Sequence, residues 1–183
     1  RAQAPSGDSR RPGLVSLKAT FESTSPSGTT PGLFFRDAEG RPRVEQGGFV
    51  TITDPVAGQG FLLDLQAKAA RRYPVPRQGS RRVQVSPPGT GSAPVQLGTG
   101  LIEGFEATGT GHKVRLPGPG SAEQTIELWS SKELQLVLLF TSSDPVAGQT
   151  SVRYYKIEKA VLDPVLFRVP SDFSIVEDLT APR

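Results

Sequence analysis

The residues that could carry out acid–base, nucleophilic or metal chemistry are few and poorly placed. The chain of 183 residues has one histidine, His112, and no cysteine, so a thiolate nucleophile and a cysteine-ligated metal are excluded. A histidine base needs a partner that the fold brings to it, and no serine lies in the Gly-x-Ser-x-Gly pattern of a nucleophile elbow. His112 lies between Gly111 and Lys113, in a glycine-rich stretch typical of a surface turn.

The acidic residues do not form a recognisable site either. Glu103 and Glu106 are three apart on an expected strand, so their side chains point to opposite faces and cannot act as a pair. Acidic clusters at 37–39 and 172–178 do not have the spacing of a calcium loop. The sequence therefore predicts a protein that is not an enzyme and that holds no metal or cofactor.

One stretch of the chain is strongly basic. Between Asp64 and Glu103 there are six cationic side chains and no acidic one. They are Lys68, Arg71, Arg72, Arg77, Arg81 and Arg82. Such a patch attracts phosphate-rich partners such as lipid headgroups, and the alternative is a solvated loop. Only Tyr73 could stack on a base and no nucleic-acid motif is present, so we expect no specific nucleic-acid partner.

The elements that would have to position any site are short strands. Glycine (20 residues) and proline (17 residues) interrupt the chain frequently, which favours strands over long helices. Apolar and polar residues alternate over 15–22, as in a strand with one buried face. Residues 136–140 are apolar on both faces, which predicts a central strand that buries Leu138. We predict a mostly β fold: a curved antiparallel sheet, or open half-barrel, with short helical turns at 130–133 and 163–167.

The same six residues, Asp-Pro-Val-Ala-Gly-Gln, occur at 54–59 and 144–149 between expected strands. In such a hairpin the aspartate caps a backbone N–H, the proline fixes φ and the glycine adopts a left-handed conformation. We therefore expect positive φ at Gly58 and Gly148. The flanks match only weakly, which favours two independent uses of one turn, although an internal duplication stays open.

The sequence predicts one domain between two tails. Residues 13–178 form the expected β domain, in which 74–100 is a long loop rich in proline and glycine or a loose edge strand. Residues 1–12 are expected to be a flexible or partner-bound arm, and 179–183 a tail. Ala2-Gln3-Ala4 is similar to the end of a signal peptide, with an ordinary tail as the alternative. No apolar run reaches the roughly 18 residues of a membrane helix.

The second half of the chain has an order of motifs that can be compared with a known group. Glu-Leu-Trp (127–129) is followed by a short turn, by Leu-Val-Leu-Leu-Phe (136–140), by a returning strand with two tyrosines (154–158), and by Asp-Pro-Val-Leu-Phe-Arg-Val-Pro-Ser-Asp-Phe (163–173). This order resembles that of exported proteins related to LolA and LolB, the carriers of bacterial lipoproteins. The resemblance implies an open half-barrel in the periplasm or outside the cell. The chain lacks a segment with helical periodicity over three turns, whereas helices plug the barrel mouth in LolA-like carriers.

Two functions follow as expectations for a secreted or periplasmic protein whose signal peptide has been removed or precedes the given sequence. In the first, the concave sheet binds a lipid or a lipoprotein acyl chain, and an aromatic set lines the cavity. That set is Trp129, Phe140, Tyr155 and Phe167. The alternative role for these aromatics is core packing. In the second function, copies of the protein assemble into a filament because the arm adds as a strand to a neighbouring subunit.

Overall fold

The computed structural model describes residues 14–77, 93–115 and 123–177, which form a single sheet of twelve strands. The order across this sheet is β12-β6-β5-β4-β3-β2-β1-β11-β10-β9-β8-β7. The elements are β1 (Leu17–Ser25), β2 (Gly28–Arg36), β3 (Pro42–Gln46), β4 (Phe49–Asp54), β5 (Gln59–Asp64), β6 (Ala69–Pro74), β7 (Val95–Ile102), β8 (Phe105–Arg115), β9 (Glu123–Ser131), β10 (Leu136–Asp144), β11 (Gly148–Lys159), the 3-10 helix η1 (Pro164–Phe167) and β12 (Ser174–Glu177).

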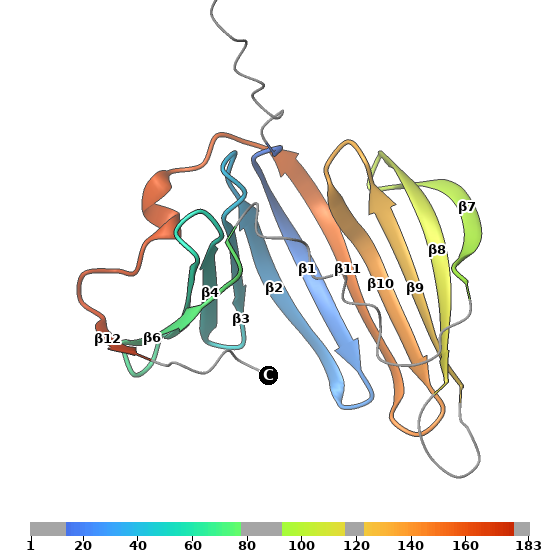
Figure 1. Cartoon of the computed structure of the whole chain (residues 1–183), viewed down its shortest axis with the longest axis horizontal. Helices are drawn as coiled ribbons and strands as arrows, with labels where there is room; N and C mark the ends of the chain where they lie inside the picture. Colours follow the sequence, from blue (N-terminus) through green and yellow to red (C-terminus); the bar gives the residue numbers. More distant parts are fainter. Residues whose placement is uncertain (1–13, 78–92, 116–122, 178–183) are drawn as a thin grey trace, which may run out of the picture.

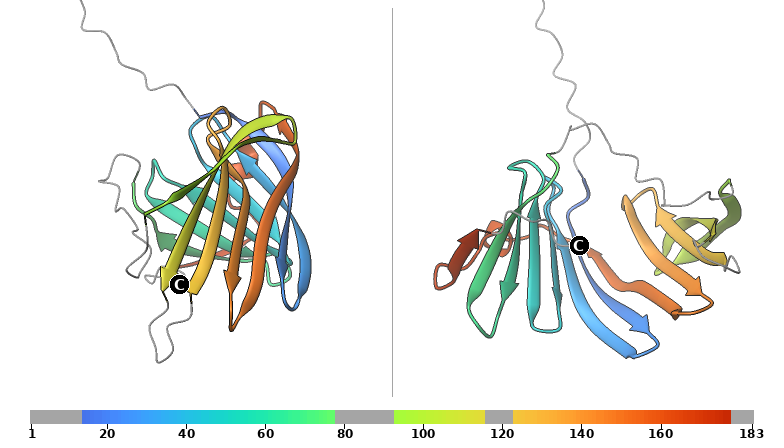
Figure 2. Two further views of the ribbon diagram at one scale, coloured as in Figure 1. Left: turned by 90° about the vertical axis from the view of Figure 1, so that its right-hand side faces the viewer. Right: turned by 60° about the horizontal axis from the view of Figure 1, so that its bottom comes forward.

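The sheet is built from two antiparallel runs that meet in its middle. Strands β1 to β6 pair in chain order, β11 pairs with β1, and β10 to β7 continue outward from β11. The short strand β12 adds to β6 in parallel. The sheet curves into an open half-barrel with β2, β1 and β11 as its floor (Figures 1 and 2). Strands β3 to β6 with β12 are its first limb, and β10 to β7 its second. The expected fold class is confirmed.

The alternation of side chains explains why these segments are strands. In β1, Leu17, Ala19 and Phe21 are buried while the residues between them are partly or fully exposed. Strand β10 lies between β9 and β11, and its Leu138 is fully buried. The predicted central strand is therefore confirmed, with Leu136 and Phe140 only half-buried at either side of Leu138.

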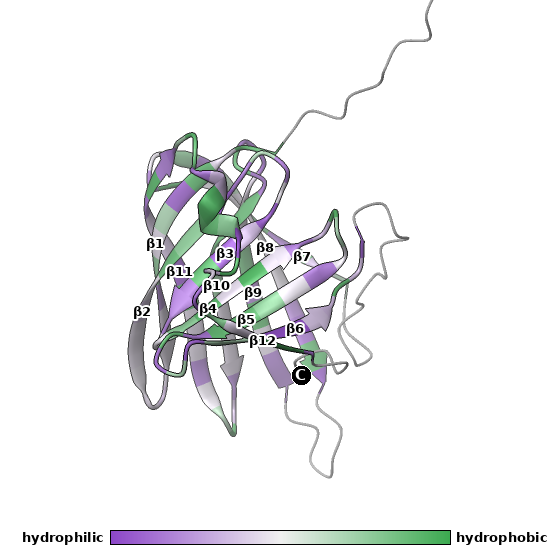
Figure 3. Ribbon diagram, turned by 90° about the vertical axis from the view of Figure 1, so that its left-hand side faces the viewer, coloured by the Kyte–Doolittle hydropathy of each residue, from purple (hydrophilic) through white to green (hydrophobic). Residues whose placement is uncertain are grey.

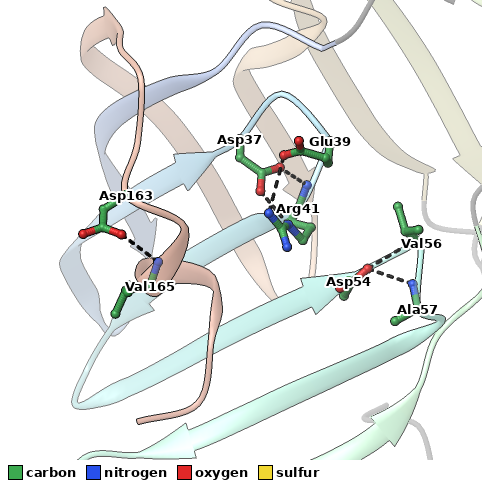
Figure 4. A network of polar contacts seen from close by, with 8 residues as sticks. All are labelled: Asp37, Glu39, Arg41, Asp54, Val56, Ala57, Asp163 and Val165. Carbon is green, nitrogen blue, oxygen red and sulfur yellow. Dashed lines mark hydrogen bonds and ion pairs between the residues drawn. The ribbon is translucent and has the colours of Figure 1, made fainter.

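The repeated turn folds as expected in both places. The Asp54 carboxylate accepts hydrogen bonds from the backbone N–H groups of Val56 and Ala57 at 2.9 and 2.8 Å (Figure 4). Asp144 accepts the equivalent pair at 2.7 and 2.8 Å. Gly58 and Gly148 have φ values of 73° and 86°, in the left-handed region that favours glycine. The hairpin interpretation of both turns is confirmed.

The short helical turn at 163–167 is also present. Asp163 accepts a hydrogen bond from the Val165 N–H at 2.9 Å and so caps η1 (Figure 4). The expected helical turn at 130–133 was wrong. The chain there forms the tight, non-helical connection between β9 and β10, because Gln135 takes a φ of 49° and reverses its direction.

One expected segment falls only partly within the described residues, and the two expected tails lie outside them. The stretch 74–100 begins at the end of β6 and contributes its last residues to β7, which is an edge strand of the described sheet. Its part at 78–92 lies outside the described residues, as do the expected arm at 1–12 and the tail at 179–183.

Two apolar clusters lie on opposite faces of the sheet. Val50, Ile52, Leu63 and Ala70 in the first limb pack under Phe167 of η1. Seen from the side of the first limb, η1 lies in front of the strands and away from the second limb (Figure 3). This cluster is therefore on the convex face, and it is called the outer cluster below. The second cluster spans the floor and the second limb, and includes Leu17, Ala19, Phe21, Phe34, Leu138, Leu134 and Ala107.

Candidate functional site

The concave face is defined by strand register. Paired residues on neighbouring strands point to the same side, and Phe21 pairs with Tyr154 while Ala19 pairs with Phe34. Phe140 continues the same face, since it pairs with Val152 on β11 and with Leu128 on β9. The residues of the outer cluster have the opposite parity. The concave face is thus a continuous apolar surface from β2 to β9.

Aromatic rings dominate the middle of this surface. The ring of Tyr154 lies 5.5 Å from that of Phe21 and 5.3 Å from that of Phe34, centroid to centroid. A Cβ at Gly32 would lie only 2.3 Å from the ring of Phe21, so the glycine leaves space for that ring to cross β2. Burial raises the pKa of the Tyr154 hydroxyl, which stays neutral. The surface is apolar and uncharged at its centre.

At the end of the concave face near residue 17, hydrogen bonds from Arg36 join the β9–β10 connection to the start of β1. Arg36 is buried and donates to three backbone carbonyls: to Val15 from Nε at 3.2 Å, to Gln135 at 2.9 Å, and to Leu134. Burial lowers the pKa of the Arg36 guanidinium from its ordinary value. These bonds hold the β9–β10 connection against the start of β1, and fully buried Leu134 packs beneath it.

A pocket of about 320 Å³ lies beside this connection. Its lining combines hydroxyl, amide and ammonium groups with two aliphatic side chains. The lining residues are Thr108, Ser130, Ser131, Lys132, Gln135, Leu136 and Val137. Thr108, Ser130 and Val137 are register partners of one another. Val137 alternates with the fully buried Leu138, and Thr108 and Ser130 are exposed next to buried Ala107 and Ser131. These three lining residues therefore point away from the second cluster.

The structure does not bring the four aromatics of the predicted lining together. Phe140 is half-buried on the concave face. Trp129 packs against the second cluster and lies over Gly109 of β8, whereas Tyr155 pairs with Thr20, which places its side chain on the convex face. Phe167 belongs to the outer cluster. Their role as ligand-lining residues stays a prediction, and among the four Phe140 and Trp129 have the position for it.

The sequence interpretation missed three concave residues that are better placed: Phe21, Phe34 and Tyr154. The signal for Phe21 was present in the alternation of 15–22, which puts Phe21 on the buried side. The choice between Tyr154 and Tyr155 could not be made from sequence, because a bulge at β11 near Lys156 resets the parity.

The basic residues are partly paired with the acidic end of the chain. Lys68 contacts Asp172 at 2.8 Å, and Arg72 contacts Glu177 at 2.5 and 3.0 Å. Arg71 pairs in register with Leu62 and shares the concave face, while the side chain of Arg77 lies against Gly58. Arg81 and Arg82 lie outside the described residues. Phosphate binding by this patch stays a prediction.

Other functional groups form no cluster in the described part of the chain. His112 is half-buried on β8 opposite Ile126. Across residues 14–77, 93–115 and 123–177, no three histidine or acidic side chains are grouped so that they could hold a metal ion. Within the same residues, the structure contains no helix with the length and apolar character needed to span a membrane.

Comparison with known proteins identifies the fold alone. No protein-family model matches the sequence, and no curated protein is similar to it. The complex of Pseudomonas aeruginosa MucA and MucB superposes with a TM-score of 0.61 at 13% identity, covering 88% of this chain and 58% of that one. A structure of MucB in complex with MucA(peri) gives a TM-score of 0.52 at 13% identity, covering 88% and 57%.

The chain thus spans less than three fifths of these neighbours. A LolA superfamily protein from Nitrosomonas europaea also matches, with 10% identity over 87% of this chain and 92% of that one, but its TM-score of 0.26 adds nothing to the argument. The chain shares its fold with the MucB structures, in keeping with the open half-barrel (Figure 2) that the order of its motifs implied.

Proposed function

We propose that this protein is a non-enzymatic binding protein of the bacterial envelope, periplasmic or secreted, that holds the apolar part of a lipid or lipoprotein on its concave face. The observation that carries this proposal is the continuous apolar surface formed by Phe21, Phe34, Tyr154, Val152 and Phe140. Tyr154, Val152 and Phe140 remain half-buried, so they keep surface that an acyl chain can cover.

The physical argument is the cost of leaving such a surface in water. Each methylene of an acyl chain contributes about 0.8 kcal/mol when it is transferred from water to an apolar surface. Small-molecule sites are concave and mostly apolar, with a few polar groups at the mouth. The middle of the concave face is apolar, as such a site requires. The resemblance of the motif order to that of LolA-like carriers is in keeping with a carrier of this kind.

Neighbouring tyrosines on opposite faces provide a matched test. Tyr154→Asn removes an aromatic ring from the concave face, and Tyr155→Asn makes the same change on the convex face. Binding of a solvatochromic fatty-acid probe should weaken at least tenfold in Tyr154→Asn and by less than twofold in Tyr155→Asn. The reason is that burying one large apolar side chain against a ligand is worth about 1.5–3 kcal/mol.

Because Tyr154 also packs in the core, Phe140→Ser provides a second concave variant, and thermal melts establish that each variant is folded. Equal effects of Tyr154→Asn and Tyr155→Asn in folded proteins would contradict the proposal. A wild-type protein that takes up no probe at all would contradict it as well.

A second candidate function is self-assembly into a filament by strand addition. Strand β7 ends the described sheet, carries no charged residue over Val95–Ile102, and exposes Val95 and Leu101. Natural edge strands are commonly protected by charged residues or proline, which this edge lacks. We expect full-length protein to associate at high concentration in sedimentation experiments, and deletion of residues 1–12 to leave a folded monomer. A full-length protein that is monomeric at high concentration would exclude this function.

A further inference from the structure

The short strand β12 lies beside β6 at the end of the first limb and is held there by few contacts (Figure 1). It has four residues, pairs with β6 in parallel, and leaves all four side chains exposed. Ile175 and Val176 are 54% and 56% exposed, and neither belongs to the outer cluster. Parallel pairing is slightly less stable per residue than antiparallel pairing. Backbone hydrogen bonds and surface charges therefore have to hold this strand.

The side chains of β12 and β6 carry opposite charges. Just before β12, Asp172 contacts Lys68 at 2.8 Å. At its end, both carboxylate oxygens of Glu177 accept hydrogen bonds from Arg72, at 2.5 and 3.0 Å. All four side chains are about half exposed. Exposed ion pairs contribute little to stability, but they select an occupant of the right charge.

The backbone of β6 that faces β12 is a strand edge. The Ser174 N–H donates to the Lys68 carbonyl at 3.0 Å, and the register continues without a shift to Glu177. Alternate residues of a strand point their N–H groups at the same neighbour, so the N–H of Val176 also faces β6 and that of Ile175 points away. Without β12, this edge of β6 would present a row of unpaired N–H and C=O groups, which is a template for another strand.

We propose that the edge of β6 is a docking site for an extended, acidic segment of a partner protein, and that β12 occupies this edge as an internal competitor. The occupant in the structure defines the chemistry of the partner segment. It is extended and parallel to β6, with a carboxylate at each end and aliphatic side chains between them. Added strands take their affinity from main-chain hydrogen bonds and their specificity from side chains. The inference concerns a strand edge and a protein partner, so it goes beyond the proposed function.

The experiment is titration of the full chain with a fluorescent peptide that has the sequence of residues 170–177. Val176→Pro removes an N–H that faces β6, and Ile175→Pro makes the same change where the N–H points away. The peptide should bind Val176→Pro about fivefold more tightly than the wild type, because loss of a ladder hydrogen bond lowers the occupancy of β6 by β12. Ile175→Pro should stay within twofold of the wild type. Thermal melts establish that each variant is folded.

The charge of the edge is tested separately, in the Val176→Pro background. Arg72→Gln removes the contact with the glutamate and should weaken peptide binding about fivefold, the upper end for an exposed ion pair. Arg71→Gln removes the same charge from the opposite face of β6 and should change the affinity by less than twofold. A peptide with lysine in place of its final glutamate should bind weakly, and Arg72→Glu should restore its affinity.

Glu177→Gln frees the edge more mildly, because it removes the pair with Arg72 and leaves the backbone of β12 unchanged. It should raise the affinity for the acidic peptide about twofold, and it carries the test if Val176→Pro does not fold. Equal affinities of the wild type, Val176→Pro and Ile175→Pro would overturn the inference, as would a peptide that binds no variant. If Val176→Pro forms dimers as its concentration rises, a second copy of the chain is the occupant and the partner segment is wrong.

Discussion

The two limbs of the sheet place their apolar side chains on opposite faces. In the first limb, the buried residues of β4, β5 and β6 point outward, where η1 and the residues around it cover them. In the floor and the second limb, Leu138, Phe140, Val152 and Tyr154 point inward. The same strand alternation therefore produces a covered core at one end of the molecule and, at the other, a half-buried surface of Phe140, Val152 and Tyr154 beside the fully buried Leu138.

The cover of the first limb is fixed by specific contacts. Arg43 on β3 donates to the Leu166 carbonyl at 2.8 Å, and the guanidinium of Arg41 lies 5.6 Å from the centre of the Phe167 ring. Arg41 is itself held by Asp37, to which its Nε donates at 2.5 Å (Figure 4). A cluster covered in this way contributes mainly to stability. The inward surface keeps exposed apolar area that a ligand could cover. Mutations in the outer cluster should therefore affect stability, and mutations on the inward surface should affect ligand binding.

Phe167→Ala should give the largest effect and should affect stability alone. Phe167 is 6% exposed, and truncating a buried phenylalanine costs about 3–5 kcal/mol. We expect the free energy of unfolding in denaturant melts to fall by that amount, while the affinity for a fatty-acid probe in the folded protein stays within twofold of the wild type.

Val165→Ala is the control for this variant, because Val165 lies in the same short helix but is 66% exposed. Its effect on unfolding should stay within about 0.5 kcal/mol, as at other surface sites. A loss of probe affinity in folded Phe167→Ala would instead restore Phe167 to the ligand-lining set.

The two identical turns allow the limbs to be compared at equal sequence. Gly148→Ala should destabilise the protein by about 1 kcal/mol or more, because its φ is positive and a Cβ would lie 2.7 Å from the ring of Pro26. Gly58→Ala carries the same backbone strain, but its Cβ would meet the side chain of Arg77, which can rotate away. Denaturant melts should therefore rank Gly148→Ala as the more destabilising variant. The reverse order would contradict the argument that the contact with Pro26 adds to a backbone strain that both variants share.

Local patterns in the sequence were enough to predict the strands and several turns. The alternation at 15–22, the apolar run at 136–140 and the two aspartate-glycine turns each reflect interactions between residues close in the chain. Capping of η1 by Asp163 is another such local interaction. These features follow from the backbone preferences of a few residues, so one sequence is sufficient to predict them.

The candidate site was harder to predict because it depends on register and on distant pairing. The side of the sheet to which Trp129 or Tyr155 points is set by bulges near Leu138 and Lys156, and a shift of one residue reverses the face. The pairing of Lys68 with Asp172 joins residues 104 apart in sequence. The hydrogen bond from buried Arg36 to the Gln135 carbonyl likewise joins residues 99 apart in sequence, and no sequence motif predicts it.

The smallest expected effect concerns the pH dependence of the turn in the second limb. Hydrogen bonds from the backbone N–H groups of Ala147 and Val146 lower the pKa of the Asp144 carboxyl. A group whose pKa is lower in the folded state stabilises the protein above its unfolded pKa, about 4 for aspartate. That contribution is lost as the pH falls through the lower, folded pKa.

Asp144→Asn keeps an oxygen acceptor at the same position but removes the titration. We expect the wild type to be slightly more stable than Asp144→Asn at pH 6, and the difference to shrink when unfolding is measured at pH 2.5. Asp172→Asn provides the comparison in the first limb, because its hydrogen bond with Lys68 lowers the pKa of Asp172 and should give the same direction of change. A difference between wild type and Asp144→Asn that grows as the pH falls would contradict the assigned capping role, since protonation should weaken only the carboxylate.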